Sequence, residues 1–290
     1  MNNQEQFLYA KIIADSYNSE FDSRVTTFEL NYPRLIHSEL MTHRLFSRNA
    51  ASSRAIPIAN VINMVRENPA MPVHWGKNQA GMQATYSVSN EDAAKALWIN
   101  AAETAASHAV VMKDMELHKQ VVNRILEPYQ WMKVVVTSTC YNNWFWLRWH
   151  KDADPTIYAL ADAMLLAYNA STPVNLYEGD WHLPYADDTS IALEDRIKIS
   201  ASCCAQTSYR KTDDSLEKAL MVYNRLIESE PVHASPVEHQ CTPIMCQNNP
   251  LDYFSIPGVT SIDKNMVPWS GNFHGWIQHR QLITGNAKVY

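Results

Sequence analysis

Apolar positions recur along the chain with two different periods, which predict both strands and helices. Residues 24–30 (RVTTFEL) are rich in β-branched and aromatic side chains and predict a strand. Residues 133–139 (KVVVTST) predict a second short strand for the same reason. Between them, residues 33–45 predict a helix that opens on a proline, because proline is tolerated in the first helical turn.

Longer stretches show helical periodicity. The Ala-rich residues 89–126 predict one long helix or two shorter ones, and residues 141–150 predict another. Asp154 then precedes Pro155, which is the pattern of an N-cap followed by a proline at the first helical position. The helix that follows carries an apolar stripe, which consists of Ile157, Leu160, Ala161, Met164, Leu165 and Tyr168. Helices with a few strands indicate an α+β fold.

Composition and charge narrow the class of protein. Hydrophobic residues make up 46% of the chain and charged residues 19%, which is enough apolar material for a sizeable core. The formal net charge of −6 disfavours a nucleic-acid partner or an anionic membrane surface, but it allows a local basic pocket. The five cysteines lack CxxC spacing, so we expect reduced thiols and no metal site. The absence of a signal-peptide pattern and of a long uncharged stretch predicts a cytoplasmic protein without membrane spans.

The segment MTHRLFSRNAASSR, residues 41–54, is polar and basic and contains no acid. On the predicted helix, Glu39 and His43 lie four residues apart on one face, and Arg44 lies on the neighbouring face. The residues that follow are expected to be irregular. Their hydroxyl and backbone N–H groups, together with Arg54, suit phosphate oxygens, which arginine binds bidentately. On composition alone, the alternative is a solvated helix end followed by a polar loop.

This segment resembles the signature RHRxxSxNExSxR of the flavin-dependent thymidylate synthases. The positions that match, in order, are His43, Arg44, Ser47, Asn49, Ser52 and Arg54. The preceding residues 26–40 (TTFELNYPRLIHSEL) also resemble the strand, proline and helix of that family. The resemblance implies that the His-Arg part contacts FAD and that the Ser-x-Arg part contacts the nucleotide.

A second segment, residues 142–164, is similar to the helix-turn-helix of the same family. In that motif an asparagine precedes by five residues the arginine of a Leu-Arg pair, so the resemblance assigns Asn143 to the flavin and Arg148 to the uracil ring. An arginine at a helix end, one turn after Trp144, suits a planar ring whose carbonyl gains negative charge. The alternative is an aromatic-rich core helix with a surface arginine. Upstream, VVNRILEP resembles the family's Ala-Arg-x-x-Leu-Pro element, which makes Arg124 a candidate for the substrate phosphate.

A third segment, residues 200–240, resembles the opening region of the family, which contains a strand, a helix and the sequence Ser-Pro-Phe-Glu-His. In the family this region precedes the signature, whereas here it follows it. The resemblance therefore implies a circular permutation, which compact domains tolerate when their termini lie close together. A strand over residues 202–209 would then pair in the sheet of residues 24–30. His239 would lie near the flavin and close to His43, although a lone histidine is also a common structural residue.

Some positions depart from the family pattern. Thr42 replaces the first arginine of the signature, Ala50 replaces its glutamate, and Asp154 replaces the glutamine of the helix-turn-helix. Glu39 stands where a glutamine is expected, which turns a donor and acceptor into an acceptor alone. The identity of the pyrimidine therefore stays open.

Taken together, the resemblance implies a divergent, phage-like member of the family. The expected fold is a single, circularly permuted α+β domain over residues 1–290, with a small sheet flanked by long helices (signature 24–57, helical region 89–170, opening region 200–240). The implied reaction is methylation of C5 of dUMP to dTMP, with FAD as cofactor, NADPH as reductant and methylenetetrahydrofolate as one-carbon donor. Family active sites lie between subunits, which implies a homotetramer.

The resemblance also distributes the roles within the site. Arg148 is the expected catalytic residue, and the FAD site is expected at His43, Arg44, Asn143 and His239. The nucleotide is expected to contact Glu39, Ser52, Ser53, Arg54 and Arg124. Two alternatives remain: methylation or hydroxymethylation of another pyrimidine nucleotide such as dCMP, or a non-catalytic flavin- or nucleotide-binding protein. Three loops that carry Trp and His have no counterpart in the family and fit a lid, an interface or core packing: residues 71–84, 179–185 and 270–280.

Overall fold

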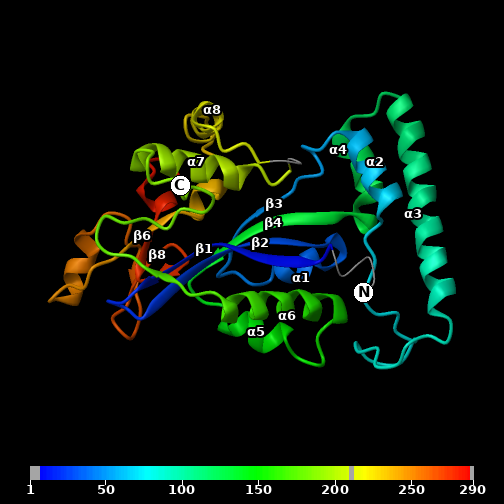
Figure 1. Cartoon of the computed structure of the whole chain (residues 1–290), viewed down its shortest axis with the longest axis horizontal. Coiled ribbons are helices and arrows are strands. Elements are labelled where there is room, and N and C mark those ends of the chain that lie inside the picture. Colours follow the sequence, from blue (N-terminus) through cyan, green and yellow to red (C-terminus); the bar gives the residue numbers. More distant parts are fainter. Residues whose placement is uncertain (1–6, 209–211, 288–290) are drawn as a thin grey trace.

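The computed structural model of the chain describes residues 7–208 and 212–287, and it places a five-stranded sheet at the centre (Figure 1). The strand order is β3-β4-β2-β1-β5. Neighbouring strands are antiparallel, except that β5 pairs parallel with β1. The strands are β1 (Tyr9–Asn18), β2 (Ser23–Pro33), β3 (Ser47–Ala50), β4 (Trp131–Ser138) and β5 (Val174–Asn175).

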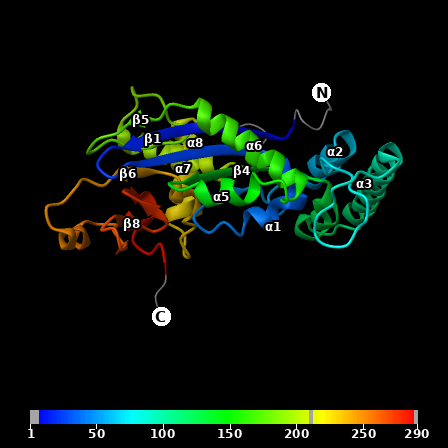
Figure 2. The same cartoon turned by 90° about the horizontal axis from the view of Figure 1, so that it is seen from below.

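One face of the sheet is apolar and carries the main core. Alternate residues of β2 (Phe28, Leu30 and Tyr32) are fully buried on this face, because side chains alternate between the two faces of a strand. They pack against α5 (Asn142–Arg148) and α6 (Pro155–Ala170), which lie on the same side of the sheet as η1 (Arg34–Ile36) and α1 (His37–Leu40) (Figures 1 and 2). The core therefore fixes α5 beside the segment that follows β2.

The opposite face is polar. It presents Thr27 and Glu29 of β2 and Lys133 and Thr137 of β4, whose side chains point away from the apolar core. The C-terminal third of the chain covers this face, as Figure 1 shows for α7 and α8. Its elements are α7 (Leu193–Ala205), α8 (Leu216–Ile227), η3 (Ser235–Glu238), β6 (Cys241–Pro243), η4 (Pro250–Ser255), β7 (Ser261–Ile262), β8 (Pro268–Ser270), β9 (Phe273–His274), β10 (Trp276–Gln278) and η5 (His279–Leu282).

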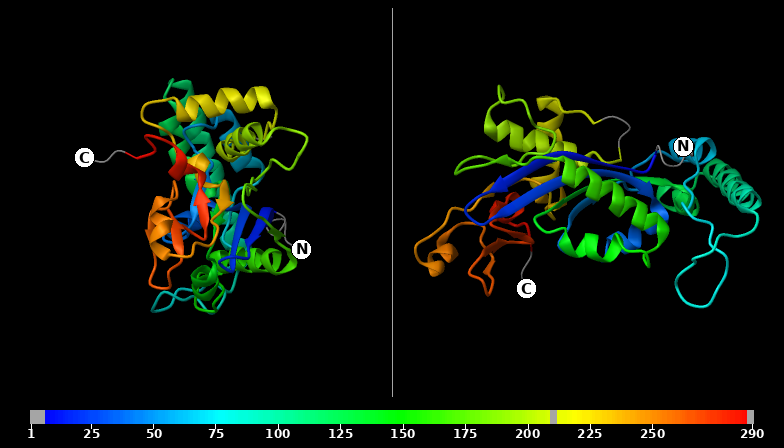
Figure 3. Two further views of the ribbon diagram at one scale, coloured as in Figure 1. Left: turned by 90° about the vertical axis from the view of Figure 1, so that its left-hand side faces the viewer. Right: turned by 60° about the horizontal axis from the view of Figure 1, so that its bottom comes forward.

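A helical arm with its own small core extends from one end of the sheet (Figure 3). It consists of α2 (Ile58–Glu67), α3 (Glu91–Asp114), α4 (Lys119–Val122) and η2 (Asn123–Tyr129). Small buried residues on one side of α3, Ala102, Ala106 and Ala109, let α2 approach closely. The arm returns the chain to the sheet at η2, directly before β4.

The structure confirms the strands predicted over residues 24–30 and 133–139, the α+β class and the helix after Asp154. The carboxylate of Asp154 accepts from the backbone N–H groups of Thr156 and Ile157, and the stripe from Ile157 to Met164 is buried. The predicted helix over residues 89–126 is interrupted after Asp114. No helix among the described residues is long and apolar enough to cross a bilayer. Within residues 7–208 and 212–287, no group of three or more His, Cys, Asp or Glu is placed to hold a metal ion.

Two predicted elements are wrong. The helix over residues 33–45 ends at Leu40, because Arg48 donates to the carbonyls of Met41 and His43 and so stabilises a turn that leads into β3. The predicted strand over residues 202–209 is instead the end of α7 and the turn after it, and Tyr209 lies outside the described residues. Residues 199–204 are all buried, as in a central strand. A helix that is covered on all sides buries consecutive residues in the same way, and α7 is such a helix at this end.

Candidate ligand-binding site

Two segments that the sequence analysis singled out meet at the guanidinium of Arg148. Its Nε donates to Nε2 of His43 at 3.1 Å, its Nη1 contacts Oε2 of Glu39 at 2.7 Å, and its Nη2 donates to Oγ1 of Thr42 at 3.3 Å. We call Glu39, Thr42, His43 and Arg148 the Arg148 cluster. Glu39 and His43 do approach a common point, although α1 ends between them.

Helix α5 holds Arg148 in this position. Trp144, one turn earlier on α5, is 1% exposed and packs edge-on against the His43 ring with 4.8 Å between ring centroids. Phe46 packs against both rings and anchors the turn to the core of the sheet. The side chain of Arg148 is therefore fixed at its base by packing and at its end by hydrogen bonds, while 19% of it stays exposed to solvent.

The electrostatics of this region keep its histidines neutral. Burial, together with the positive charges of Arg148 and Arg48, lowers the pKa of His43 to about 4. Burial also lowers the pKa of His37 to about 4, with Arg34 and Arg48 acting in the same direction. Neutral imidazoles beside guanidinium groups leave the segment with a local excess of positive charge, which suits an anionic ligand.

A second polar cluster forms where the end of the signature segment meets η2. Oε1 of Glu127 accepts from Oγ of Ser53 at 2.9 Å and from Nη1 of Arg124 at 2.9 Å, and it forms an ion pair with Nη2 of Arg34 at 3.0 Å. We call Arg34, Ser53, Arg124 and Glu127 the Glu127 cluster. Asn123 fastens η2 to the signature by donating to the carbonyl of Ser53 at 2.7 Å. The structure thus brings Arg124 to the signature, and its role at the substrate phosphate stays a prediction.

Arg48 and His37 lie between the two clusters. Arg48 donates to the carbonyl of His43, and its charge acts on His37, as the charge of Arg34 also does. Arg34, Arg48 and Glu127 were not predicted as site residues. The signal for them was the density of arginines from residue 34 to residue 54, in a protein of formal net charge −6.

Three of the residues predicted to contact a ligand have side chains whose hydrogen-bonding groups are unused among the described residues. Arg44, Arg54 and Asn143 are exposed, and their side chains make no hydrogen bond within residues 7–208 and 212–287. Ser52 is also exposed, and its hydroxyl accepts only from the backbone N–H of Arg54 among the described residues. These side chains leave donors for a ligand that carries anionic oxygens.

His239 lies on the other face of the sheet. Its Nδ1 is 2.8 Å from Oγ1 of Thr137, on the polar face, whereas His43 packs against Trp144 on the apolar side. The expected closeness of His239 and His43 is therefore not found. The region 200–240 does contact the signature strand, because Asn49 donates to the carbonyl of Cys204 at 3.1 Å.

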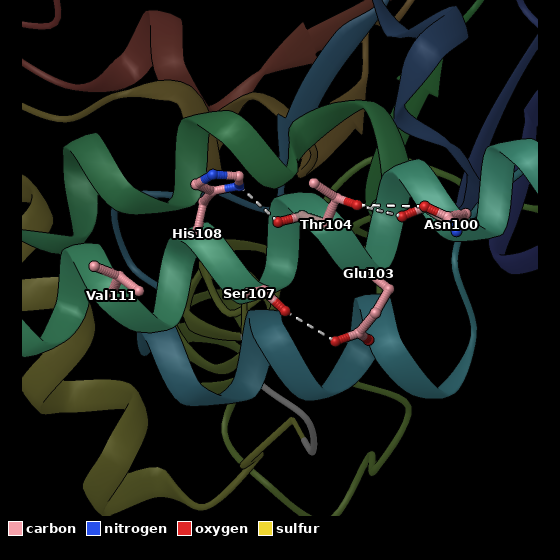
Figure 4. A pocket seen from close by; sticks show the side chains of 6 residues that line it. All are labelled: Asn100, Glu103, Thr104, Ser107, His108 and Val111. Atoms are coloured by element: carbon pink, nitrogen blue, oxygen red, sulfur yellow. Dashed lines mark hydrogen bonds between the residues drawn. The ribbon is translucent and has the colours of Figure 1, made fainter.

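The helical arm carries a separate shallow pocket of 460 Å³ along α3, whose lining residues are Asn100, Glu103, Thr104, Ser107, His108 and Val111 (Figure 4). The polar side chains in it bond along their own helix, as in the contact of 3.2 Å from Ser107 to Glu103. Glu103 also pairs with Arg66 of α2. These contacts are typical of a solvated helix surface, so the pocket adds nothing to the candidate site.

The comparisons with known proteins give partial structural likeness only. No protein-family model and no curated protein matches the chain. Solved structures that resemble it include the UMP/dUMP methylase PolB from Streptomyces cacaoi, bound with 5-Br dUMP (18% identity, TM-score 0.43, 52% of this chain and 69% of that chain). The same protein bound with 5-Br UMP gives 18% identity and a TM-score of 0.44 over 56% of this chain and 88% of that one.

Thymidylate Synthase X (ThyX) from Helicobacter pylori, with FAD and dUMP, is also similar. It gives 18% identity and a TM-score of 0.35 over 50% of this chain and 67% of that one. Identities and scores at this level do not establish a family.

Proposed function

We propose that this chain is a flavin-dependent enzyme that methylates C5 of a pyrimidine deoxynucleotide, with dUMP as substrate, methylenetetrahydrofolate as one-carbon donor and NADPH as reductant. The observation that carries the proposal is the hydrogen bond of 3.1 Å between Arg148 and His43. Each residue belongs to a segment that independently resembles the same family, and 105 residues separate them. Neither a solvated helix end nor an aromatic core helix with a surface arginine requires this meeting.

The chemistry of the exposed donors fits FAD. The Arg44 guanidinium and the Asn143 amide are exposed and make no side-chain hydrogen bond with any described residue, so they are available to diphosphate oxygens and to the polar edge of a ring. They flank the Arg148 cluster in sequence, one on each of the two converging segments. When bound, FAD in its reduced form supplies the hydride that completes the new methyl group.

The nucleotide is proposed to lie between the two clusters. Its phosphate would be held by Arg54, Arg124 and Ser52, whose side chains are exposed, and by Ser53, a buried residue whose hydroxyl would turn from Glu127 to the phosphate. In this arrangement Glu127 orients Arg124 and limits the positive charge of the site in the absence of phosphate. The ring would then extend toward Arg148.

Arg148 has the geometry to act on the ring. A guanidinium has five N–H groups, and three of them donate to Glu39, Thr42 and His43, which leaves two for a ligand. When C5 attacks a one-carbon unit, negative charge grows on the ring carbonyl and on N3. A guanidinium held at that edge stabilises the activated ring more than the resting ring, which raises the rate.

A substrate such as dCMP is the second candidate, and Glu39 supports it. The Glu39 carboxylate lies 2.7 Å from Arg148 and places an acceptor beside the guanidinium. The N4 amino group of cytosine is a donor that glutamate can accept, while the guanidinium matches the O2 acceptor. The product in that case would be a 5-methyl or 5-hydroxymethyl cytosine nucleotide.

A homotetramer with sites between subunits is also part of the proposal. Large exposed apolar side chains adjoin Arg148 in the sequence: Trp146 is 74% exposed, Leu147 42% and Trp149, directly after α5, 46%. Exposed tryptophan and leucine side chains beside a candidate site support an interaction surface there. A second subunit seated there would exclude water from the proposed ring site.

The visible absorption spectrum of the purified protein, followed by an NADPH oxidation assay, tests the proposal. We expect flavin absorption after incubation with FAD and removal of the unbound cofactor, and NADPH oxidation that depends on added dUMP or dCMP. Flavin absorption without any nucleotide-dependent oxidation would support a non-catalytic binding protein. Absence of flavin from the folded protein would refute the proposal.

A further inference from the structure

A continuous chain of buried hydrogen bonds crosses the polar face of the sheet. Oγ of Ser16 lies 2.9 Å from Nδ1 of His182, and Nε2 of His182 lies 2.8 Å from Oγ1 of Thr27. Oγ1 of Thr27 lies 2.7 Å from Oγ1 of Thr137, which lies 2.8 Å from Nδ1 of His239. All five side chains are at most 5% exposed, and Thr27, Thr137 and His239 are fully buried.

The two ends of this hydrogen-bond path, Ser16 and His239, differ in their surroundings. Ser16 and His182 line a pocket of 530 Å³ between β1 and α7, together with Asp15, Trp181, Asp187 and Arg196, so the Ser16 end adjoins solvent. At the other end, Nε2 of His239 is buried and has no hydrogen-bond partner among the described residues. A buried polar atom without a partner is rare in folded proteins, and it indicates a ligand or a water molecule at that position.

The framework that holds the two histidines is shared. The backbone of His182 exchanges hydrogen bonds with Cys241, the N–H of His182 donating at 2.8 Å and its carbonyl accepting at 3.3 Å. Cys241 lies two residues after His239, so one short backbone pairing fixes both rings. Burial lowers the pKa of each histidine to about 3, so both rings are neutral near neutral pH and each has one donor and one acceptor nitrogen.

Donor counting then couples the two rings. Each hydroxyl has one proton, so Thr27 and Thr137 each donate one of these bonds and accept the other. If Ser16 donates to His182, every bond runs from Ser16 toward His239, and both rings carry their proton on Nε2. If every bond is reversed, both rings carry their proton on Nδ1. A mixed arrangement leaves either a buried hydroxyl proton without an acceptor or the two threonine oxygens 2.7 Å apart with no proton between them.

We propose that these five side chains form a proton relay between the pocket at Ser16 and a ligand at Nε2 of His239. In one passage, the Nε2–H of His239 gives its proton to a basic group of the ligand, and Nδ1 takes the proton of Thr137. Thr137 takes the proton of Thr27, which takes the Nε2 proton of His182. Nδ1 of His182 takes the proton of Ser16, and Ser16 takes one from water in the pocket, so one proton reaches the ligand and all bonds are reversed.

The ligand that fits this end has a polar ring edge that can accept and release a proton, because Nε2 serves as a donor in one state and as an acceptor in the other. A flavin presents such an edge, and at His239 it would lie on the face of the sheet opposite His43. In naming it the inference rests on the proposal that this chain binds FAD, but not on the contacts proposed for Arg44 and Asn143. The relay itself depends only on the contacts of the ligand-free protein. Its first test is therefore independent of flavin binding.

That test is the tautomer of each histidine in the ligand-free, ¹⁵N-labelled protein, measured by two-bond ¹H–¹⁵N correlation NMR. The relay requires His182 and His239 to show the same tautomer, Nε2–H in both or Nδ1–H in both. Opposite tautomers would overturn the proposal, whatever the protein binds.

The second test breaks the path. Thr27→Val should slow the exchange of the His239 ring proton with solvent by roughly tenfold or more, because it removes a hydroxyl that links His239 to the pocket. Thr27→Ser keeps the hydroxyl and should restore the exchange rate of the parent. Ser138→Ala is the matched control. It removes a buried hydroxyl of β4 that bonds to the carbonyls of Leu45 and Cys140 and takes no part in the hydrogen-bond path, so it should leave the rate unchanged.

An unchanged exchange rate in folded Thr27→Val would show that protons reach His239 by another route and would overturn the relay. Addition of FAD then tests the ligand. A shift of the His239 Nε2 signal on addition of FAD supports the flavin as the ligand. If FAD binds elsewhere without such a shift, the identification of the ligand fails while the tautomer result still decides the relay.

Discussion

Nε of Arg148 donates a hydrogen bond of 3.1 Å to Nε2 of His43, across 105 residues of sequence. Nε2 is therefore an acceptor, and the neutral ring carries its proton on Nδ1. The lowered pKa of His43, caused first by burial and then by the neighbouring arginines, agrees with this neutral form. The imidazole thus orients the guanidinium without competing for its positive charge.

Lysine at position 148 should be a poor substitute for arginine. It keeps the charge but loses the planar group that contacts Glu39, Thr42 and His43 together. We expect Arg148→Lys to bind FAD almost normally and to lose at least roughly 100-fold in kcat, the scale seen when a preorganised donor to developing charge is removed. Turnover equal to that of the parent would show that Arg148 only completes the helix.

Loss of the Arg44 side chain should weaken FAD. Arg44→Ala removes charge-assisted hydrogen bonds worth about 1.5–3 kcal/mol, so FAD affinity should fall about tenfold or more. Arg66→Ala is the matched control, because Arg66 lies on the helical arm and pairs with Glu103. Equilibrium titration of FAD fluorescence measures both variants. Equal affinity in folded Arg44→Ala and in the parent would exclude Arg44 from the flavin site.

Glu39 should influence the choice of pyrimidine. Glu39→Gln removes the ion pair with Arg148 and adds a donor, which favours the O4 acceptor of uracil over the N4 donor of cytosine. We expect the ratio of kcat/KM for dUMP to that for dCMP to rise by roughly tenfold or more, as expected when a buried polar group loses its complementary partner. An unchanged ratio in competition assays would mean that Glu39 does not contact the pyrimidine ring.

The buried histidines should make stability depend on pH. Burial lowers the pKa of His182 from 6.5 to about 3, so between these values the unfolded chain binds a proton that the folded protein does not. This contribution to stability is fully present above pH 6.5 and is lost as the pH falls toward 3. Each such group adds up to about 1.4 kcal/mol per pH unit to the slope of the unfolding free energy.

His182→Gln should reduce that slope by the contribution of up to one bound proton. Urea denaturation at a series of pH values measures the unfolding free energy and hence the slope. The comparison concerns the slope, so a general loss of stability in the variant does not affect it. Above pH 6.5 the two proteins should show the same slope. A parent and a variant with equal slopes in the acidic window would mean that His182 binds its proton in the folded protein as readily as in the unfolded chain.

The sequence was sufficient for the elements whose patterns are local. The β-branched residues of β2 and β4 and the Asp154-Pro155 cap acted as their types predict, because propensity and capping depend on near neighbours. The end of α1 and the start of β3 were not predictable in this way. They depend on the bonds from Arg48 to the carbonyls of Met41 and His43, which form only once β3 has paired with β4.

The same distinction holds for the candidate site. The resemblance assigned Glu39, His43 and Arg148 to one site, and the structure brings the three side chains together, while their ligand contacts stay predictions. The joining of Ser53 and Arg124 through Glu127 was not anticipated, since nothing in the spacing of Glu127 indicates a shared carboxylate. The chain of bonds from Ser16 to His239 joins four distant parts of the sequence, and hydroxyl residues in strands give no local signal of such a contact.

Mass spectrometry of the nucleotide product tests the central claim most directly. The protein is incubated with FAD, NADPH and methylenetetrahydrofolate, and with dUMP or dCMP in separate reactions. The account predicts that dUMP is converted to dTMP, with one carbon added at C5, and that omission of FAD or of the folate abolishes the product. A flavin-loaded, folded protein that leaves C5 of both nucleotides unmodified would contradict it.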